Sequence, residues 1–202
     1  MLSRTTIALL LTAALTTARA AIELPPTPHE STCEGFTHKE LHFKDGKRQA
    51  VYQLPGGWSF RPREGGVKLV PPNSFADAVI LAGSQPGSQP LDEKGIEDGK
   101  QEFLRTLPPG AQLVTIVSEQ RNPVLLDNKP SYEVIASYQL MGEHFVRSAL
   151  FTKSLDTQVT FRLTARKSDF EKLHQIFRSS ILSWHWLDRP DASDAGPLTA
   201  SK

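Results

Sequence analysis

The chain has 202 residues, and its 23 Lys and Arg against 22 Asp and Glu give a net charge of +1 with neutral histidines. A charge this close to zero argues against a dedicated nucleic-acid-binding protein, which normally carries a strongly basic face. It also gives no reason to expect adhesion to anionic lipid. The length is typical of one domain with a hydrophobic core of its own.

Residues 1–20 have the pattern of a secretory signal peptide. Arg4 supplies a positive charge, Ile7–Leu15 is apolar except for one threonine, and Ala18-Arg19-Ala20 has the small-x-small form of a cleavage site. We expect cleavage after Ala20. The apolar run is too short for a permanent membrane span. The mature chain is therefore expected in a bacterial periplasm or outside the cell, without membrane insertion.

Composition divides the remaining chain into three parts. Residues 21–37 are rich in proline and are expected to form an extended leader. Residues 38–187 are expected to fold as one α+β domain. Residues 188–202 contain mostly Asp, Ala, Ser, Pro and Gly, a composition that predicts disorder.

Within the expected domain, short apolar or alternating stretches predict a series of strands. Residues 158–165 alternate most clearly, because Val159, Phe161 and Leu163 lie on one side and Thr160 and Arg162 on the other. Such a period of two indicates a sheet with one buried face. The predicted strands are Gln49–Leu54, Val67–Val70, Ala76–Ala82, Leu113–Ser118, Tyr132–Met141, His144–Thr152 and Gln158–Ala165.

Two helices are predicted. The first, Ile96–Leu107, ends at Pro108-Pro109-Gly110. In the second, Ser168 is expected to be the N-cap, with Glu171 completing a capping box. Its inward stripe is expected to be Phe170, Leu173, Ile176, Phe177 and Ser180.

This order of elements predicts an α+β fold. Four consecutive long strands with tight connections should be antiparallel, and the helices on either side should cover them. We therefore expect an antiparallel β-sheet covered by helices, an α-β-α sandwich.

The chain resembles the PsbP-like family over about residues 45–186. The resemblance is carried by Tyr52-Gln53-Leu54-Pro55-Gly56-Gly57-Trp58, by Pro130-Ser131-Tyr132-Glu133-Val134, and by the closing strand, helix and Ile181-Leu182-Ser183-Trp184. It implies an antiparallel sheet between helices. It also implies an accessory or binding role, because most members bind or assist other proteins and do not catalyse. The matched positions are packing positions, so no catalytic residue is carried over.

The strongest chemical pattern is His29-x-x-x-Cys33-x-x-x-x-His38-x-x-x-His42. Imidazole and thiolate are good ligands for zinc or copper. The spacing matches no known finger, and a Pro-rich leader offers few second-shell partners. Solvent-facing histidines, with Cys33 free or in an intermolecular disulfide, are the simpler interpretation.

The other candidate sites favour ordinary structural roles. Residues 92–99 are acidic but lack the ligand spacing of an EF-hand, so a loop leading into a helix is the simpler interpretation. Gly83-Ser84-Gln85-Pro86-Gly87 has its serine in the wrong place for a nucleophile elbow. Trp184 and Trp186 could bind a ligand if exposed, but are expected in the core.

The sequence therefore predicts an exported, non-enzymatic accessory or protein-binding domain. One face of the sandwich or the Gly/Ser/Pro stretch 83–90 would contact the partner. The alternative is a zinc- or copper-binding protein that uses His29, Cys33, His38 and His42.

Overall fold

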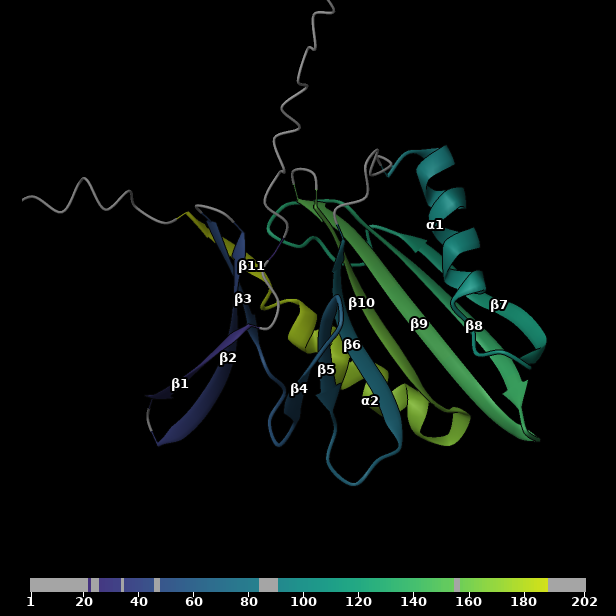
Figure 1. Ribbon diagram of the computed structural model, residues 1–202, viewed down its shortest axis with the longest axis horizontal. Coiled ribbons are helices and arrows are strands. Elements are labelled where there is room, and N and C mark those ends of the chain that lie inside the picture. Colours follow the sequence, from purple (N-terminus) through teal and green to yellow (C-terminus); the bar gives the residue numbers. More distant parts are fainter. Residues whose placement is uncertain are drawn as a thin grey trace, which may run out of the picture.

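The computed structural model describes residue 22 and residues 26–33, 35–45, 48–83, 91–154 and 157–188 (Figure 1). Within this part the chain forms eleven strands and two helices. The predicted signal peptide, most of the Gly/Ser/Pro stretch and the predicted tail beyond residue 188 lie outside the described residues.

The strands form two antiparallel sheets. The small sheet has the order β1-β2-β3-β11 and the large sheet the order β4-β5-β6-β10-β9-β8-β7. The strands of the small sheet are β1 (Thr27–Cys33), β2 (Phe36–Asp45), β3 (Arg48–Gln53) and β11 (His185–Asp188). Those of the large sheet are β4 (Ser59–Arg63), β5 (Gly66–Val70), β6 (Ala76–Gly83), β7 (Gln112–Arg121), β8 (Ser131–Leu140), β9 (Glu143–Ser154) and β10 (Thr157–Arg166). The helices are α1 (Glu93–Arg105) and α2 (Lys167–Ile181).

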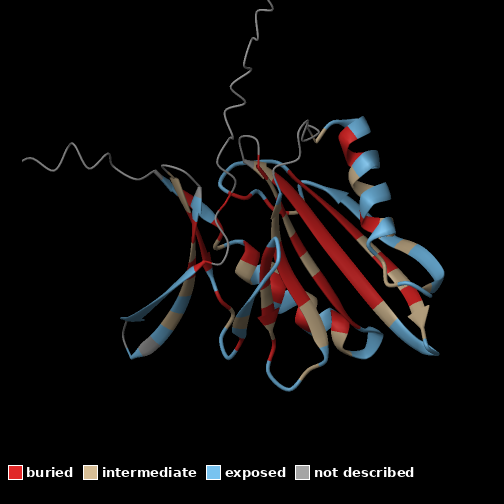
Figure 2. Ribbon diagram, viewed as in Figure 1, coloured by how far each residue is buried: buried red, intermediate tan, exposed pale blue. Residues whose placement is uncertain are grey.

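The main core lies between one face of the large sheet and a layer made by α2 and the small sheet (Figure 2). Val159, Phe161 and Leu163 of β10 contribute one side, as their alternation predicted. Phe43 and Tyr52 of the small sheet join them from across the core. The Tyr52 hydroxyl lies 2.6 Å from Ser180 Oγ of α2, so a partly buried hydrogen bond also ties the small sheet to this helix.

A smaller core lies on the opposite face of the large sheet, under α1. Ile96 and Phe103 of α1 pack there against β8 and β9. Asp92 begins this helix, because its Oδ1 accepts a hydrogen bond from the backbone N–H of Gly95 at 2.8 Å. The acidic stretch 92–99 was expected to be a loop that leads into a helix, but Asp92 is the N-cap and residues 93–99 already belong to α1, so the helix begins earlier than predicted.

The predicted α-β-α sandwich is wrong. Strands predominate in the described residues, and a second sheet occupies much of the space where a helical layer was expected. The prediction missed β1, β2 and β11, and with them most of the second sheet, and it also missed β4 at the edge of the large sheet. Residues 27–33 of the expected leader pair along their whole length with β2. Alternation in β2 buries Leu41 and Phe43 and thereby places this hairpin on the core.

The predicted strands after residue 48 are all present, but the capping box of the last helix is wrong. The N-cap of α2 is Arg166, without a side-chain capping bond, and Ser168 lies inside the first turn. The reason is that β10 runs directly into α2, which leaves no extended residue at position 168. The predicted stripe is buried at Phe170, Leu173 and Phe177, whereas Ile176 is 37% exposed.

Trp184 is the largest fully buried side chain, which confirms the core interpretation of the Trp184-His185-Trp186 segment. Its ring meets Phe161 edge-on at 5.2 Å and Trp186 edge-on at 5.7 Å, and it lies 5.3 Å from Phe43. Trp184 therefore joins both sheets in one aromatic cluster. Edge-to-face aromatic pairs add to the free energy gained from burial alone.

We expect Trp184→Ala to lower the free energy of unfolding by about 3–5 kcal/mol, because it leaves a cavity where the two sheets meet. Urea unfolding followed by circular dichroism measures this loss. Leu182→Ala, at an exposed position two residues earlier, is the control and should change stability by less than about 0.5 kcal/mol. Equal losses in the two variants would contradict the core role of Trp184.

A buried carboxylate attaches α2 to the large sheet. Glu133 of β8 is buried, its Oε1 lies 2.8 Å from His174 Nε2, and its Oε2 lies 3.5 Å from Arg178 NH1. The His174 ring also stacks on Phe170 at 5.0 Å. Removing one partner of a buried hydrogen bond costs more than replacing both, because it leaves the other polar group buried without that partner.

We expect His174→Ala to destabilise the protein by about 3 kcal/mol, since Glu133 then keeps only the longer contact to Arg178. The double variant Glu133→Leu/His174→Leu should recover most of this loss, because it removes the buried charge together with its partner. Urea unfolding of both variants at neutral pH is the measurement. A double variant that is less stable than the single one would show that Glu133 and His174 are not coupled in this way.

Candidate functional site

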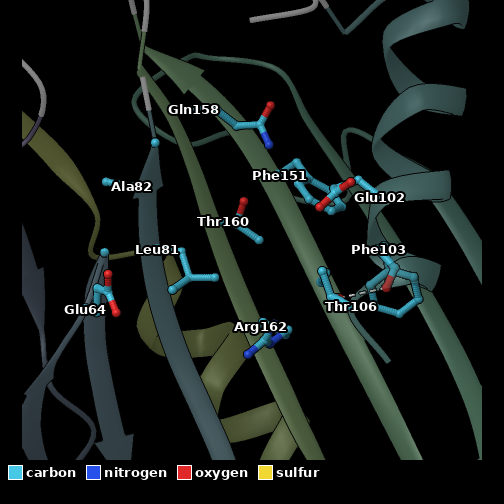
Figure 3. A pocket seen from close by; sticks show the side chains of 13 residues that line it. Glu64, Leu81, Ala82, Glu102, Phe103, Thr106, Phe151, Gln158, Thr160 and Arg162 are labelled. Carbon is cyan, nitrogen blue, oxygen red and sulfur yellow. Dashed lines mark hydrogen bonds between the residues drawn. The ribbon is translucent and has the colours of Figure 1, made fainter. Parts of the chain in front are cut away.

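A pocket of about 270 Å³ lies between α1 and the exposed part of the large sheet (Figure 3). This volume is just below the range of about 300–1,000 Å³ typical of small-molecule sites. Its lining includes Leu81, Phe103, Phe151, Gln158, Thr160 and Arg162.

The alternation of β10 supplies the polar floor of this pocket. Gln158, Thr160 and Arg162 follow one another along the strand on the face opposite to Val159 and Phe161 (Figure 3). Leu81 of β6 lies on one side of this row, and Phe103 and Thr106 at the end of α1 lie on the other. The pocket exists because α1 packs over β8 and β9 and leaves this face of β10 uncovered.

Arg162 is the charged group at one end of the row. Its NH2 lies 3.6 Å from Asp77 Oδ2, and Lys68 Nζ lies 3.1 Å from the other oxygen of the same carboxylate. Arg162 Nε is buried and has no hydrogen-bond partner. Burial lowers the pKa of Arg162, and the nearby charge of Arg147 lowers it further. The carboxylate of Asp77 opposes these two effects, because it favours the charged form of Arg162.

Arg147 is the second buried cation of this region, and its position is fixed. Its Nε donates to Thr164 Oγ1 at 2.8 Å, and its NH1 donates to the backbone oxygen of Thr106 at 2.6 Å. The second bond ties β9 to the C-cap of α1. Burial lowers the pKa of Arg147 as well. Arg147 thus holds the wall of the pocket in place, whereas Arg162 faces the pocket.

The polar groups of this lining are few. It contains no histidine, cysteine or serine, and the Thr106 hydroxyl donates to the backbone oxygen of Phe103 at 2.8 Å. The remaining polar side chains of the lining are Glu64, Glu102, Gln158, Thr160 and Arg162.

The predicted metal ligands lie on the β1–β2 hairpin, where the register separates them into two pairs. His29 and His42 are in contact, with ring centroids 4.0 Å apart. Cys33 pairs with Phe36 in the register and His38 with Ser31, about four residues, or ~13 Å, along the strands from the first pair. The described residues contain no cluster of three side chains that could hold a metal ion.

Both ring nitrogens of His42 already have protein partners. Gln49 Nε2 lies 2.6 Å from Nδ1, and Glu40 Oε2 lies 3.1 Å from Nε2. His38 Nδ1 similarly lies 2.8 Å from Gln53 Nε2. These contacts give the histidines a structural role in the hairpin, and zinc or copper binding stays a prediction.

A group of exposed apolar side chains marks the free edge of the large sheet, at β7. We call it the β7-edge patch; its members, with exposed fractions, are Leu113 (74%), Val114 (43%), Val117 (60%) and Met141 (96%). Met141 belongs to this end of the sheet because Gln112, beside Leu113, pairs with Gln139. The register of β7 is interrupted between Gln112 and Thr115 and between Ile116 and Ser118, so the patch coincides with two bulges.

Sequence reasoning missed both the pocket and the β7-edge patch. Arg162 was noticed only as a polar member of an alternating strand, because the sequence does not show that α1 leaves this face uncovered. The sequence did place a turn at Met141-Gly142-Glu143 between two long strands, and the structure has its turn at Met141 and Gly142. What the sequence pattern did not show is the conformation and the full exposure of the Met141 side chain.

No helix in the described part of the chain is long and apolar enough to cross a membrane. Comparison with protein-family models and with curated proteins gave no match.

Comparison with solved structures did find similar folds. The solution structure of cyanobacterial PsbP (CyanoP) from Synechocystis is 14% identical, with a TM-score of 0.52, and covers 87% of this chain and 98% of its own. LpqN, involved in cell envelope biogenesis of Mycobacterium tuberculosis, is also 14% identical, with a TM-score of 0.49, and covers 81% of this chain and 91% of its own. The first likeness carries the assignment: although the α-β-α layering expected here is wrong, the chain has the PsbP-like fold that the sequence predicted.

Proposed function

We propose that this protein is an exported, non-catalytic accessory protein that binds an apolar surface of another exported protein through the β7-edge patch. Export is supported by the signal-peptide pattern of residues 1–20. The non-catalytic role is the one that the likeness to the PsbP-like fold supports.

The observation that carries this proposal is the conformation of Met141. The turn between β8 and β9 consists of Met141 and Gly142, which both have positive φ, 52° and 81°. A hairpin turn of this kind favours Asn-Gly, because a bulky side chain is strained at positive φ. Met141 accepts this strain and gains no burial in return, since it is 96% exposed.

Leu113 repeats the same combination on the neighbouring strand. Its φ is 51°, and its side chain is 74% exposed. Two strained, solvent-exposed apolar residues at one end of a sheet stabilise neither the turn nor the core. Backbone strain of this kind concentrates at functional sites, and exposed apolar patches mark interaction surfaces.

The two bulges of β7 favour binding through side chains over pairing with a further strand. An edge strand can accept a further strand through its backbone, but bulges interrupt the regular row of hydrogen-bonding groups. The two irregularities of β7 therefore oppose strand addition and leave side-chain contact as the way to bind. A partner with a complementary apolar surface fits this edge.

We expect Met141→Asn to raise the free energy of unfolding by about 0.5–1 kcal/mol, because asparagine suits the positive φ, and to weaken partner binding about tenfold, because the contact is lost. Thermal unfolding measures the first effect. Photo-crosslinking in the exported compartment, from a crosslinking residue at position 117, measures the second.

A crosslinking residue at Leu182 is the control, since Leu182 is exposed and apolar but lies after α2, outside the patch. The proposal requires one product of defined mass that forms from position 117, does not form from position 182, and weakens in Met141→Asn. A product of unchanged yield in Met141→Asn, or equal products from the two positions, would refute the β7-edge patch as the binding surface.

A further inference from the structure

We propose that the pocket between α1 and β10 binds a small carboxylic acid with an apolar body, and that Arg162 receives the carboxylate. This site is separate from the β7-edge patch and goes beyond the accessory role proposed above. It rests on the charges, the apolar wall and the size of the pocket.

Positive charge exceeds negative charge around Arg162, at one end of the pocket. Arg162 and Lys68 share the single carboxylate of Asp77, and Arg147 lies near enough for its charge to act on Arg162. Buried charges are normally paired and hydrogen-bonded, because leaving them uncompensated is costly. A bound anion would supply the missing compensation.

Arg162 is available to a ligand in the pocket. Its contact with Asp77 is 3.6 Å long, whereas a charge-assisted hydrogen bond is about 2.7–2.9 Å. Its Nε is buried without any acceptor, so a ligand would meet the terminal nitrogens of the guanidinium, which lines the pocket with its side chain 14% exposed. The long contact with Asp77 leaves these terminal nitrogens able to form the paired hydrogen bonds that a carboxylate offers.

An apolar wall lies beside this cation. Leu81, Phe103 and Phe151 surround the row of β10 side chains, and Thr160 lies between Gln158 and Arg162 along the strand (Figure 3). A ligand with its charge at Arg162 would thus place its remaining atoms against leucine and phenylalanine. The volume of about 270 Å³ restricts that body to one ring or a short chain.

The carboxylates at the rim of the pocket disfavour ligands with more than one negative charge. Two further carboxylates border the pocket, Glu64 at the β4–β5 turn and Glu102 on α1, and both lie away from Arg162 (Figure 3). Glu102 has its own partner, since its Oε2 lies 3.7 Å from Arg105 NH1. These two negative charges repel a second anionic group, so the pocket favours a monoanion over inorganic phosphate.

Titration of the full-length protein with benzoate, benzamide and inorganic phosphate tests this inference. Isothermal titration calorimetry gives the affinity, and protein NMR shows whether the amides of β10 and α1 respond. We expect saturable binding of benzoate, with benzamide and phosphate at least about tenfold weaker. Arg162→Gln should weaken benzoate binding by about 10- to 100-fold, the value of a hydrogen bond to a charged group.

Two further variants separate binding from folding. Arg166→Gln makes the same charge change at the end of the same strand, about 13 Å away, and should leave benzoate affinity unchanged. Thr160→Phe fills the pocket at a half-buried position without a change of charge and should abolish binding. Circular dichroism establishes that each variant is folded.

Each outcome decides the proposal. Benzoate binding that depends on Arg162 and on the space at Thr160, but not on Arg166, supports it. Equal affinity for benzamide, tighter binding of phosphate, equal losses in Arg162→Gln and Arg166→Gln, or no benzoate binding to the folded wild-type protein would each overturn it.

Discussion

The two-sided character of β10 is the constraint on which the rest of the structure depends. This strand lies in the middle of the large sheet, between β6 and β9, and its side chains alternate strictly between apolar and polar. The apolar side, with Phe161 at its centre, meets Trp184 and the Tyr52 ring across the main core. The polar side forms the floor of the pocket. One strand thereby fixes the position of the core and of the candidate site on opposite faces of the same sheet.

Helix α1 covers only part of the large sheet on the face opposite to the main core. It packs where the side chains of that face are apolar. Tyr132, Val134 and Ala136 of β8 make that face apolar under α1, and the helix packs there. On β10 the corresponding positions are Thr160 and Arg162, which give a helix little to pack against. The helix therefore ends over β9, and Arg147 fastens its C-cap by a bond to the Thr106 backbone. The open pocket is thus a consequence of side-chain polarity.

These packing relations explain how far the sequence could predict the structure. Most strands after residue 48 and both helices have clear periodicity, whereas β4 and β11 are short and were not predicted. The burial of Trp184 was expected because large aromatic side chains mainly serve cores. The β1–β2 hairpin was missed because Pro28 and the histidines suggested an extended leader, while alternation at Leu41 and Phe43 was the signal that pointed to a strand. The pocket depends on which face α1 leaves uncovered, and no local pattern in the sequence contains that information.

The proposed binding role of the β7-edge patch is compatible with an exposed sheet edge. A long, flat, apolar edge strand would pair with other strands through its backbone without regard to their side chains. The bulges around Val114 and Val117 interrupt this backbone template but leave the apolar side chains exposed. Under the proposed function, recognition would depend on the shape of the partner's surface, which is a more selective criterion than backbone hydrogen bonding. The positive φ angles of Leu113 and Met141 fit the same interpretation. Both positions would suit asparagine or glycine better, yet both carry large apolar side chains that are exposed.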